Sequence, residues 1–137
     1  MTEVKTEDLL TKITDPFAYA EIVHGTYLQP LPLIMKGGLN RMARNHIHMA
    51  IGKPGKNGVI SGMRASCEVV IEVNMPKAIF GEHKIDFHIS SNKVILSEGL
   101  KDGSIPTEYF RTVLDYKNNK YLYEAPIDYI CVYDFEC

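Results

Sequence analysis

Alternation of apolar and charged residues is clearest in the stretch Cys67-Glu68-Val69-Val70-Ile71-Glu72-Val73. Successive side chains of a β-strand point to opposite faces, so this alternation predicts a strand with one buried face. Glu68 and Glu72 would lie on the outward face. The side chains expected to face a core are Cys67, Val69, Ile71 and Val73.

Working outward from this stretch, the chain reads as further short strands with a few short helices. The predicted strands cover 20–23, 45–50, 84–89 and 93–96, with two more from Tyr109 onward, around a Lys117-Asn118-Asn119 turn. The predicted helices cover 7–13, 31–36 and 76–80. Gly25 would end the first strand, and Thr6 would cap the first helix. This mixture predicts a single α+β domain over 1–137. The apolar residues expected to close its core include Val69, Ile71, Val73, Ile85, Phe87, Val94 and Leu96.

Composition limits the possible classes of function. The 137 residues suit one domain, and 45% hydrophobic with 23% charged residues is typical of a globular chain. The net charge of −2 excludes a strongly basic, sequence-indifferent nucleic-acid binder but allows a local basic site. No apolar run approaches a membrane span, and the N-terminus lacks the layout of a signal peptide. Three cysteines without CxxC spacing favour a reducing intracellular compartment, with Cys67 as a core residue.

Arg44, His46 and His48 alternate with Asn45, Ile47 and Met49. On a strand, this spacing places one guanidinium and two imidazoles on the same face. Such a face suits a phosphate, because a guanidinium fork and imidazole donors bind its oxygens. A zinc site would need a third ligand, and Arg44 would repel the ion. Plain structural histidines are the remaining alternative.

Two glycine-containing segments add weaker signals. His24-Gly25-Thr26 follows the first predicted strand and by itself suits a strand-ending turn. The segment Gly58-Val59-Ile60-Ser61-Gly62-Met63-Arg64 offers main-chain N–H groups and a cation, as phosphate loops do. It lacks the spacing of a Walker or Rossmann loop, so by itself it favours a hairpin loop.

Taken together, these segments resemble the KptA/tRNA 2′-phosphotransferase family over roughly Val4 to Phe110. The strings that carry the resemblance are His24-Gly25-Thr26-Tyr27, Gly38-Leu39, Arg41-Met42-Ala43-Arg44-Asn45-His46-Ile47-His48, Gly58-Val59-Ile60-Ser61-Gly62-Met63-Arg64, Ser91-Asn92-Lys93-Val94-Ile95-Leu96 and Pro106-Thr107-Glu108-Tyr109-Phe110. The resemblance implies the NAD-binding lobe of the enzyme, with an ADP-ribosyltransferase-like fold of short antiparallel strands in a split sheet.

The resemblance also implies a reaction. Family enzymes use NAD, without a metal, to remove the 2′-phosphate that tRNA ligation leaves at a splice junction. The RNA phosphate attacks C1″ of the nicotinamide ribose and expels nicotinamide. The ribose O2″ then attacks the phosphorus, which leaves a 2′-OH on the RNA and releases ADP-ribose cyclic phosphate. The implied partner is therefore 2′-phosphorylated RNA, a tRNA in particular.

Four residues match family positions of known role. His24, His48 and Val94 match a His-His-Val triad around the NAD ribose and nicotinamide, and Arg44 matches an arginine that grips the RNA 2′-phosphate. We therefore expect Arg44 and His48 to be catalytic. The residues expected to bind NAD are His24, Gly25, Thr26, His46, His48, Gly62, Arg64, Asn92 and Val94.

The sequence departs from the family pattern in two ways. Lys93 stands where the family has glycine. The Arg-His pair and the further arginine of the family's N-terminal RNA-binding lobe match no string in this chain. We therefore expect either a fragment of a longer protein or a natural short form that borrows or lacks the lobe, with 111–137 as an extension. Phosphate transfer should be very slow unless the lobe is supplied elsewhere, and we also expect a monomer. The alternatives are NAD-dependent ADP-ribosylation of nucleic-acid phosphate ends and a non-catalytic NAD or ADP-ribose binding module.

Overall fold

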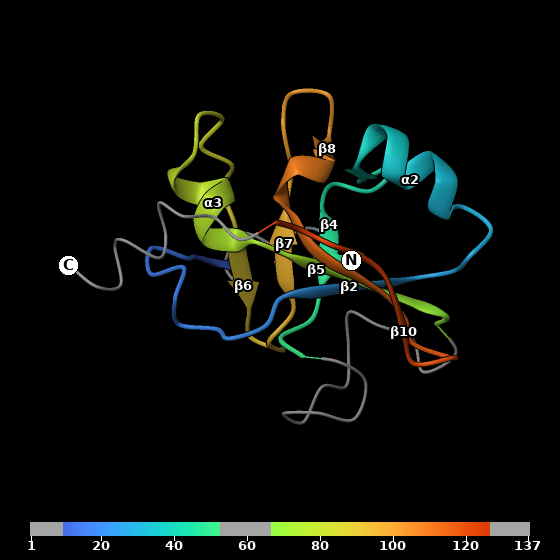
Figure 1. Cartoon of the computed structure of the whole chain (residues 1–137). Helices are drawn as coiled ribbons and strands as arrows, with labels where there is room; N and C mark the ends of the chain where they lie inside the picture. Colours follow the sequence, from blue (N-terminus) through green and yellow to red (C-terminus); the bar gives the residue numbers. More distant parts are fainter. Residues whose placement is uncertain (1–9, 53–66, 127–137) are drawn as a thin grey trace.

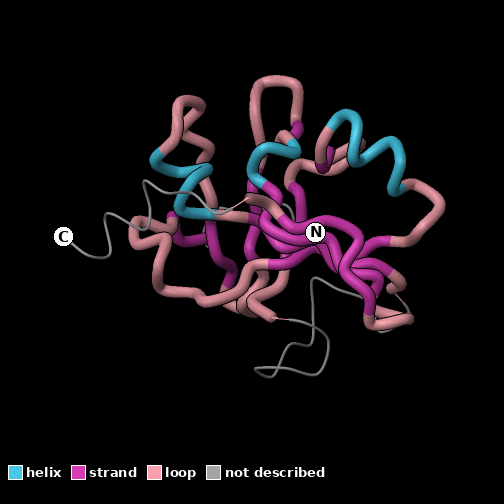
Figure 2. The backbone as a smooth tube through the Cα atoms, viewed as in Figure 1, coloured by secondary structure: helices cyan, strands magenta, loops and turns pink. Residues whose placement is uncertain are grey.

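The computed structural model describes residues 10–52 and 67–126. Its strands are β1 (Leu10–Lys12), β2 (Val23–Thr26), β3 (Leu39–Asn40), β4 (Ile47–Met49), β5 (Val69–Val73), β6 (His88–Ser90), β7 (Ile95–Ser97), β8 (Ser104–Ile105), β9 (Phe110–Asp115) and β10 (Lys120–Glu124). Its helices are α2 (Leu31–Gly37), α3 (Met75–Phe80) and the 3-10 turn η2 (Thr107–Tyr109). The prediction of an α+β domain is confirmed (Figure 2).

The strands form two four-stranded sheets and a small pair. The orders are β1-β6-β7-β4 and β10-β9-β5-β2, with β3 beside β8, and all pairings within them are antiparallel. In Figure 1 the α-helices lie along one side of the strands, at the top of the view. Among the described residues, no helix is both long enough and apolar enough to cross a membrane.

β5 lies at the centre of its sheet, between β2 and β9. Val69, Ile71 and Val73 are buried in the main core, as their alternation predicted. Cys67 is also buried, but the prediction of its face is wrong. It belongs to a smaller cluster with Val70, because the chain turns into the strand only after Cys67.

The two large sheets meet at β2 and β4. Val23 and Ala50 exchange main-chain hydrogen bonds, with N···O distances of 2.9 and 2.7 Å. Their side chains pack in the smaller cluster with Cys67 and Val70. We call this junction the seam; it places His24 of β2 close to His48 of β4.

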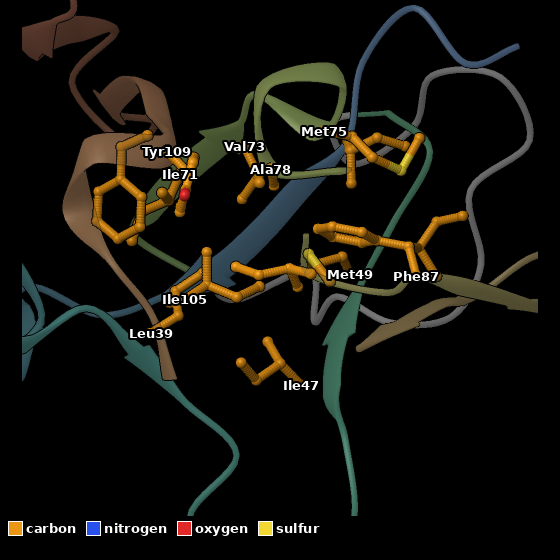
Figure 3. Packing of buried hydrophobic residues seen from close by; sticks show 14 of the residues in the cluster. Leu39, Ile47, Met49, Ile71, Val73, Met75, Ala78, Phe87, Ile105 and Tyr109 are labelled. Atoms are coloured by element: carbon orange, nitrogen blue, oxygen red, sulfur yellow. The ribbon is translucent and has the colours of Figure 1, made fainter. Parts of the chain in front are cut away.

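The main core fills the space between the sheets and the helices. Met49 and Phe87 point into it (Figure 3), and Ile85 is buried there too, as predicted. Val94 and Leu96 are buried but lie outside this cluster, whereas Ile95 between them belongs to it. Because side chains alternate along a strand, Val94 and Leu96 lie on the sheet face opposite to Ile95.

Local capping explains both α-helices. Pro32 lies in the first turn of α2, and Gly38 ends it with φ +91°, donating its N–H to the Ile34 carbonyl at 2.7 Å. A Cβ at Gly38 would collide with the Ile105 carbonyl oxygen, so the chain packs closely onto β8 here. In α3 the Asn74 side chain accepts the Lys77 N–H.

Several predicted boundaries are wrong. The helix over 7–13 is not formed at Leu10–Lys12, which pairs with β6 as a strand; its earlier residues lie outside the described ranges. Sheet pairing outweighs the weak helix propensity of so short a segment. β2 begins three residues later than predicted and contains Gly25, which does not end it. The predicted 45–50 and 84–89 strands begin only at Ile47 and His88.

Candidate active site

A tight turn leads into β4. It spans Arg41 to Arg44 and is closed by the Arg44 N–H, which donates to the Arg41 carbonyl at 2.9 Å. Arg44 and His46 lie in the bend before Ile47, so they are not on one strand face with His48. The alternation argument is therefore wrong in its geometry. Even so, the bend returns the Arg44 guanidinium to His48.

His48 stands between two possible hydrogen-bond partners. Its Nδ1 lies 3.2 Å from the His46 carbonyl oxygen and 3.4 Å from Nη1 of Arg44. With a proton, Nδ1 donates to the carbonyl; without one, it accepts from Arg44. Partial burial, followed by the Arg44 charge, lowers the pKa of His48 below its usual 6.5. His48 is thus held as a neutral imidazole at pH 7.

His24 is joined to the same strand across the seam. Its Nδ1 lies 2.8 Å from the His48 carbonyl oxygen. A carbonyl only accepts, so Nδ1 carries the hydrogen. Burial is the main cause that lowers the pKa of His24; the hydrogen bond to the main chain of His48 opposes this effect, and charge on His48 and Arg44 adds to it. Neutral His24 therefore presents Nε2 as a hydrogen-bond acceptor.

Gly25 and Thr26 continue β2 beyond His24. They face Val70 and Val69 of β5, and the Thr26 carbonyl accepts the Glu68 N–H at 2.9 Å. The strand-ending turn considered for this segment is therefore wrong. His24-Gly25-Thr26 is part of the sheet edge at the seam.

His46 has different surroundings from the other two histidines. Burial is the main cause that lowers its pKa, the nearby Glu98 carboxylate opposes this effect, and the charges of His88 and Arg41 add to it. Glu98 follows β7, and His88 begins β6. Sequence reasoning gave His88 no chemistry and did not find Glu98.

Val94 lies on the same sheet face as His48. Leu96 is directly opposite His48 on one side and His88 on the other, and residues opposite each other share a face. Val94 is two residues from Leu96, so alternation gives it this face as well. Asn92 lies at the exposed tip of the hairpin, with its N–H 3.3 Å from Ser90 Oγ.

Lys93 also belongs to this hairpin and has φ +69°. This left-handed conformation favours glycine. At Lys93 the sequence therefore departs from the family pattern, although the conformation of the turn favours the glycine that the family has there.

Two predicted site residues, Gly62 and Arg64, lie outside the described ranges, as does the whole 58–64 segment. Within those ranges, no group of three or more His, Cys, Asp or Glu side chains could hold a metal ion. The cationic Arg44 beside His48 is instead suited to an anion.

Comparison with known proteins bears on the family of the chain. The family model described as RNA 2′-phosphotransferase, Tpt1 / KptA family, matches residues 1–99. The chain belongs to this family. The family predicted from the motifs around His24, Arg44 and His48 is therefore confirmed.

Named relatives of this RNA 2′-phosphotransferase family member are similar over most of the chain. It is 47% identical over 93 residues to tRNA 2′-phosphotransferase 1 of Bos taurus, covering 68% of this chain and 36% of the relative. Identity to tRNA 2′-phosphotransferase 1 of Homo sapiens is 42% over 93 residues, with the same two shares. To tRNA 2′-phosphotransferase of Saccharomyces cerevisiae it is 36% over 110 residues, covering 79% and 45%. The chain thus spans less than half the length of these relatives.

Proposed function

We propose that the seam is the NAD- and phosphate-binding site of an RNA 2′-phosphotransferase, within an ADP-ribosyltransferase-like fold. The observation that carries this proposal is the linked set His24, His48 and Arg44. His24 bonds to the main chain of His48, whose imidazole lies 3.4 Å from the Arg44 guanidinium. The names of the relatives support a tRNA substrate.

The residues at the seam fit NAD. The Nε2 of neutral His24 can accept a hydrogen bond from a ribose hydroxyl. Val94 and Leu96 are buried on the sheet face that also carries His48 and make that face apolar, which suits contact with a nicotinamide ring. When bound, NAD would supply an electrophilic ribose carbon and nicotinamide as the leaving group.

Arg44 has the role of holding the RNA 2′-phosphate. Its guanidinium is exposed, and a planar fork can bind two phosphate oxygens at once. A cation placed there lowers the cost of the charge that develops on phosphorus. Neutral His48 can support Arg44 without competing for the anion.

Val94 provides no proton acceptor, and the proposed chemistry needs none. The 2′-phosphate is already an anion, so a general base would not improve it as a nucleophile. In the second step the proton of the ribose hydroxyl ends on the new 2′-OH of the RNA. This balance leaves His24 and His48 with positioning and hydrogen-bonding roles.

The proposal is tested by nicotinamide release from NAD in the presence of 2′-phosphorylated and of unphosphorylated RNA. We expect release only with the 2′-phosphate, together with ADP-ribose cyclic phosphate. Release accompanied by ADP-ribose attached to the RNA would indicate ADP-ribosylation of a phosphate end. Binding of NAD with no release would indicate a binding module and contradict the proposal.

A further inference from the structure

Arg41 bonds to both main-chain polar groups of Arg44. The Arg44 N–H donates to the Arg41 carbonyl at 2.9 Å, and Nη1 of Arg41 donates to the Arg44 carbonyl at 3.1 Å. The first bond is that of an ordinary β-turn. The second adds a side-chain clamp to the same turn.

A glycine on a neighbouring segment makes room for this clamp. The β3–β8 ladder continues beyond the pair Asn40 and Ser104, because the Arg41 N–H donates to the Gly103 carbonyl at 2.9 Å. The Arg41 side chain lies across Gly103, where an added Cβ would come within 2.9 Å of Nε and 3.0 Å of Cγ. Gly103 also has φ +84°, so both its conformation and its surroundings favour glycine.

The turn needs a constraint of this kind. Met42, its second residue, has φ +56°, and its side chain is 79% exposed. A non-glycine residue in this conformation is strained by about 1–2 kcal/mol, and an exposed side chain gains no packing in return. Hydrogen bonds from Arg41 and from the Asn40 side chain, which accepts the Met42 N–H at 2.7 Å, hold the turn in place.

We propose that Arg41 is a positioning residue, whose side chain clamps the Arg41–Arg44 turn against Gly103 and so holds the Arg44 guanidinium beside His48. The inference rests on the proposed function in assigning the RNA 2′-phosphate to Arg44. Arg41 itself acts through Arg44. Its contribution is a single hydrogen bond to a carbonyl together with the contact of its stem on Gly103.

This role predicts a contrast between the two arginines. A lysine ammonium can also donate to one carbonyl, so Arg41→Lys should keep phosphate transfer within roughly 3-fold of the wild type. Arg41→Met keeps the stem but loses the donor, and misplacement of Arg44 should slow transfer about 10-fold to 100-fold. At Arg44, where the fork itself binds the phosphate, lysine should not rescue.

The first test is an NMR titration of the histidines in the 137-residue chain. Arg44 lowers the pKa of His48, alongside burial and the charge of His46, whereas Arg41 acts directly on His46. In Arg41→Met we therefore expect the pKa of His48 to rise toward 6.5. Lys120→Met, which removes a more exposed charge on β10, should leave the pKa of His48 unchanged. An unchanged pKa of His48 in Arg41→Met would overturn the proposal.

The second test is kinetic and separates this inference from the proposed function. Phosphate transfer is measured at varied NAD and varied RNA; in Arg41→Met we expect kcat to fall while KM for NAD stays the same. A fall in kcat matched by an equal rise in the KM for NAD would overturn the positioning role. An unchanged kcat would overturn it as well. If the wild-type chain transfers no phosphate, the proposed function fails and the titration alone decides. Arg41→Gln, too short to reach the Arg44 carbonyl, replaces Arg41→Met if that variant does not fold.

Discussion

The charge states of single residues decide what the seam can bind. Burial is the main cause that lowers the pKa values of His24 and His48 and so favours their neutral forms, whereas the Arg44 guanidinium is an exposed cation. The site therefore combines one fixed cation with two neutral hydrogen-bonding rings. That combination suits an anionic group beside the hydroxyls of a sugar.

Replacing Arg44 should separate phosphate transfer from NAD binding. Arg44→Ala should reduce the rate of transfer by about 100-fold to 1,000-fold, because a preorganised charge is lost. Its effect on the Kd of NAD, measured by calorimetry, should be small, since its partner is the RNA phosphate. Arg44→Lys should recover little of the rate. Equal losses in NAD affinity and in rate would contradict this assignment.

Replacing His24 should weaken nucleotide binding directly. His24→Ala removes the ring that carries Nε2, and the loss of hydrogen bonds to a buried ribose costs about 1–3 kcal/mol. Calorimetry in the presence of a chelator measures this loss and also tests whether binding needs a metal. Unchanged NAD affinity in His24→Ala would remove His24 from the site, and loss of wild-type binding on adding chelator would favour a metal site.

Folding stability should fall as the pH is lowered. The pKa values of His24, His46 and His48 lie below 6.5 in the folded chain, so the unfolded chain binds more protons once the pH approaches 6.5. The free energy of unfolding is therefore highest above pH 6.5 and decreases until the pH passes the folded-state values. Urea unfolding between pH 7.5 and 5 measures this slope. His24→Gln should reduce this slope; a slope unchanged by that substitution would show that the pKa of His24 is not lowered in the folded chain.

Single residues also show what the sequence could predict about the site. His24, Arg44 and His48 were identified from local strings, and they do come together. Arg41 was not assigned a role, because its hydrogen bond to the Arg44 carbonyl depends on a turn and its neighbour Gly103 is distant in the chain. No local pattern in the sequence reports such a juxtaposition.

At the scale of elements, prediction succeeded where one segment carries its own signal. The alternation in β5, the turn between β9 and β10, and the proline and glycine that bound α2 each indicate structure locally. β3 and β8, of two residues each, carry no such signal. β1 forms only because β6 offers a partner, which no local propensity reveals.

The seam offers a test at this scale. Ala50 is almost fully buried beside Val23 and Val70, so Ala50→Leu should overpack the smaller cluster and separate β2 from β4. We expect the free energy of unfolding to fall by about 1–3 kcal/mol. NAD binding should weaken as well, because His24 and His48 are held together across this junction.

Asn74→Ala provides the matched control for Ala50→Leu. It removes the cap of α3 and should cost about 1 kcal/mol of stability, as urea unfolding would measure. Because Asn74 lies outside the seam, NAD affinity should be unchanged. If both variants weakened NAD binding in proportion to their loss of stability, the seam would have no special role.

At the scale of the whole molecule, the two large sheets join at β2 and β4, and the proposed site residues His24 and His48 lie at this junction. The chain spans 36% of the Bos taurus relative. The family resemblance implies that the Arg-His pair and the further arginine of the RNA-binding lobe hold the phosphate together with Arg44. Groups that act as a unit are strongly non-additive, so we expect transfer by this chain alone to be slow.

The central claim is tested most directly by single-turnover reaction of a 2′-phosphorylated oligonucleotide with excess chain and excess NAD. We predict slow formation of 2′-OH RNA, nicotinamide and ADP-ribose cyclic phosphate in equal amounts, dependent on NAD and lost in Arg44→Ala. Release of inorganic phosphate, reaction without NAD, or products undiminished by Arg44→Ala would contradict the account.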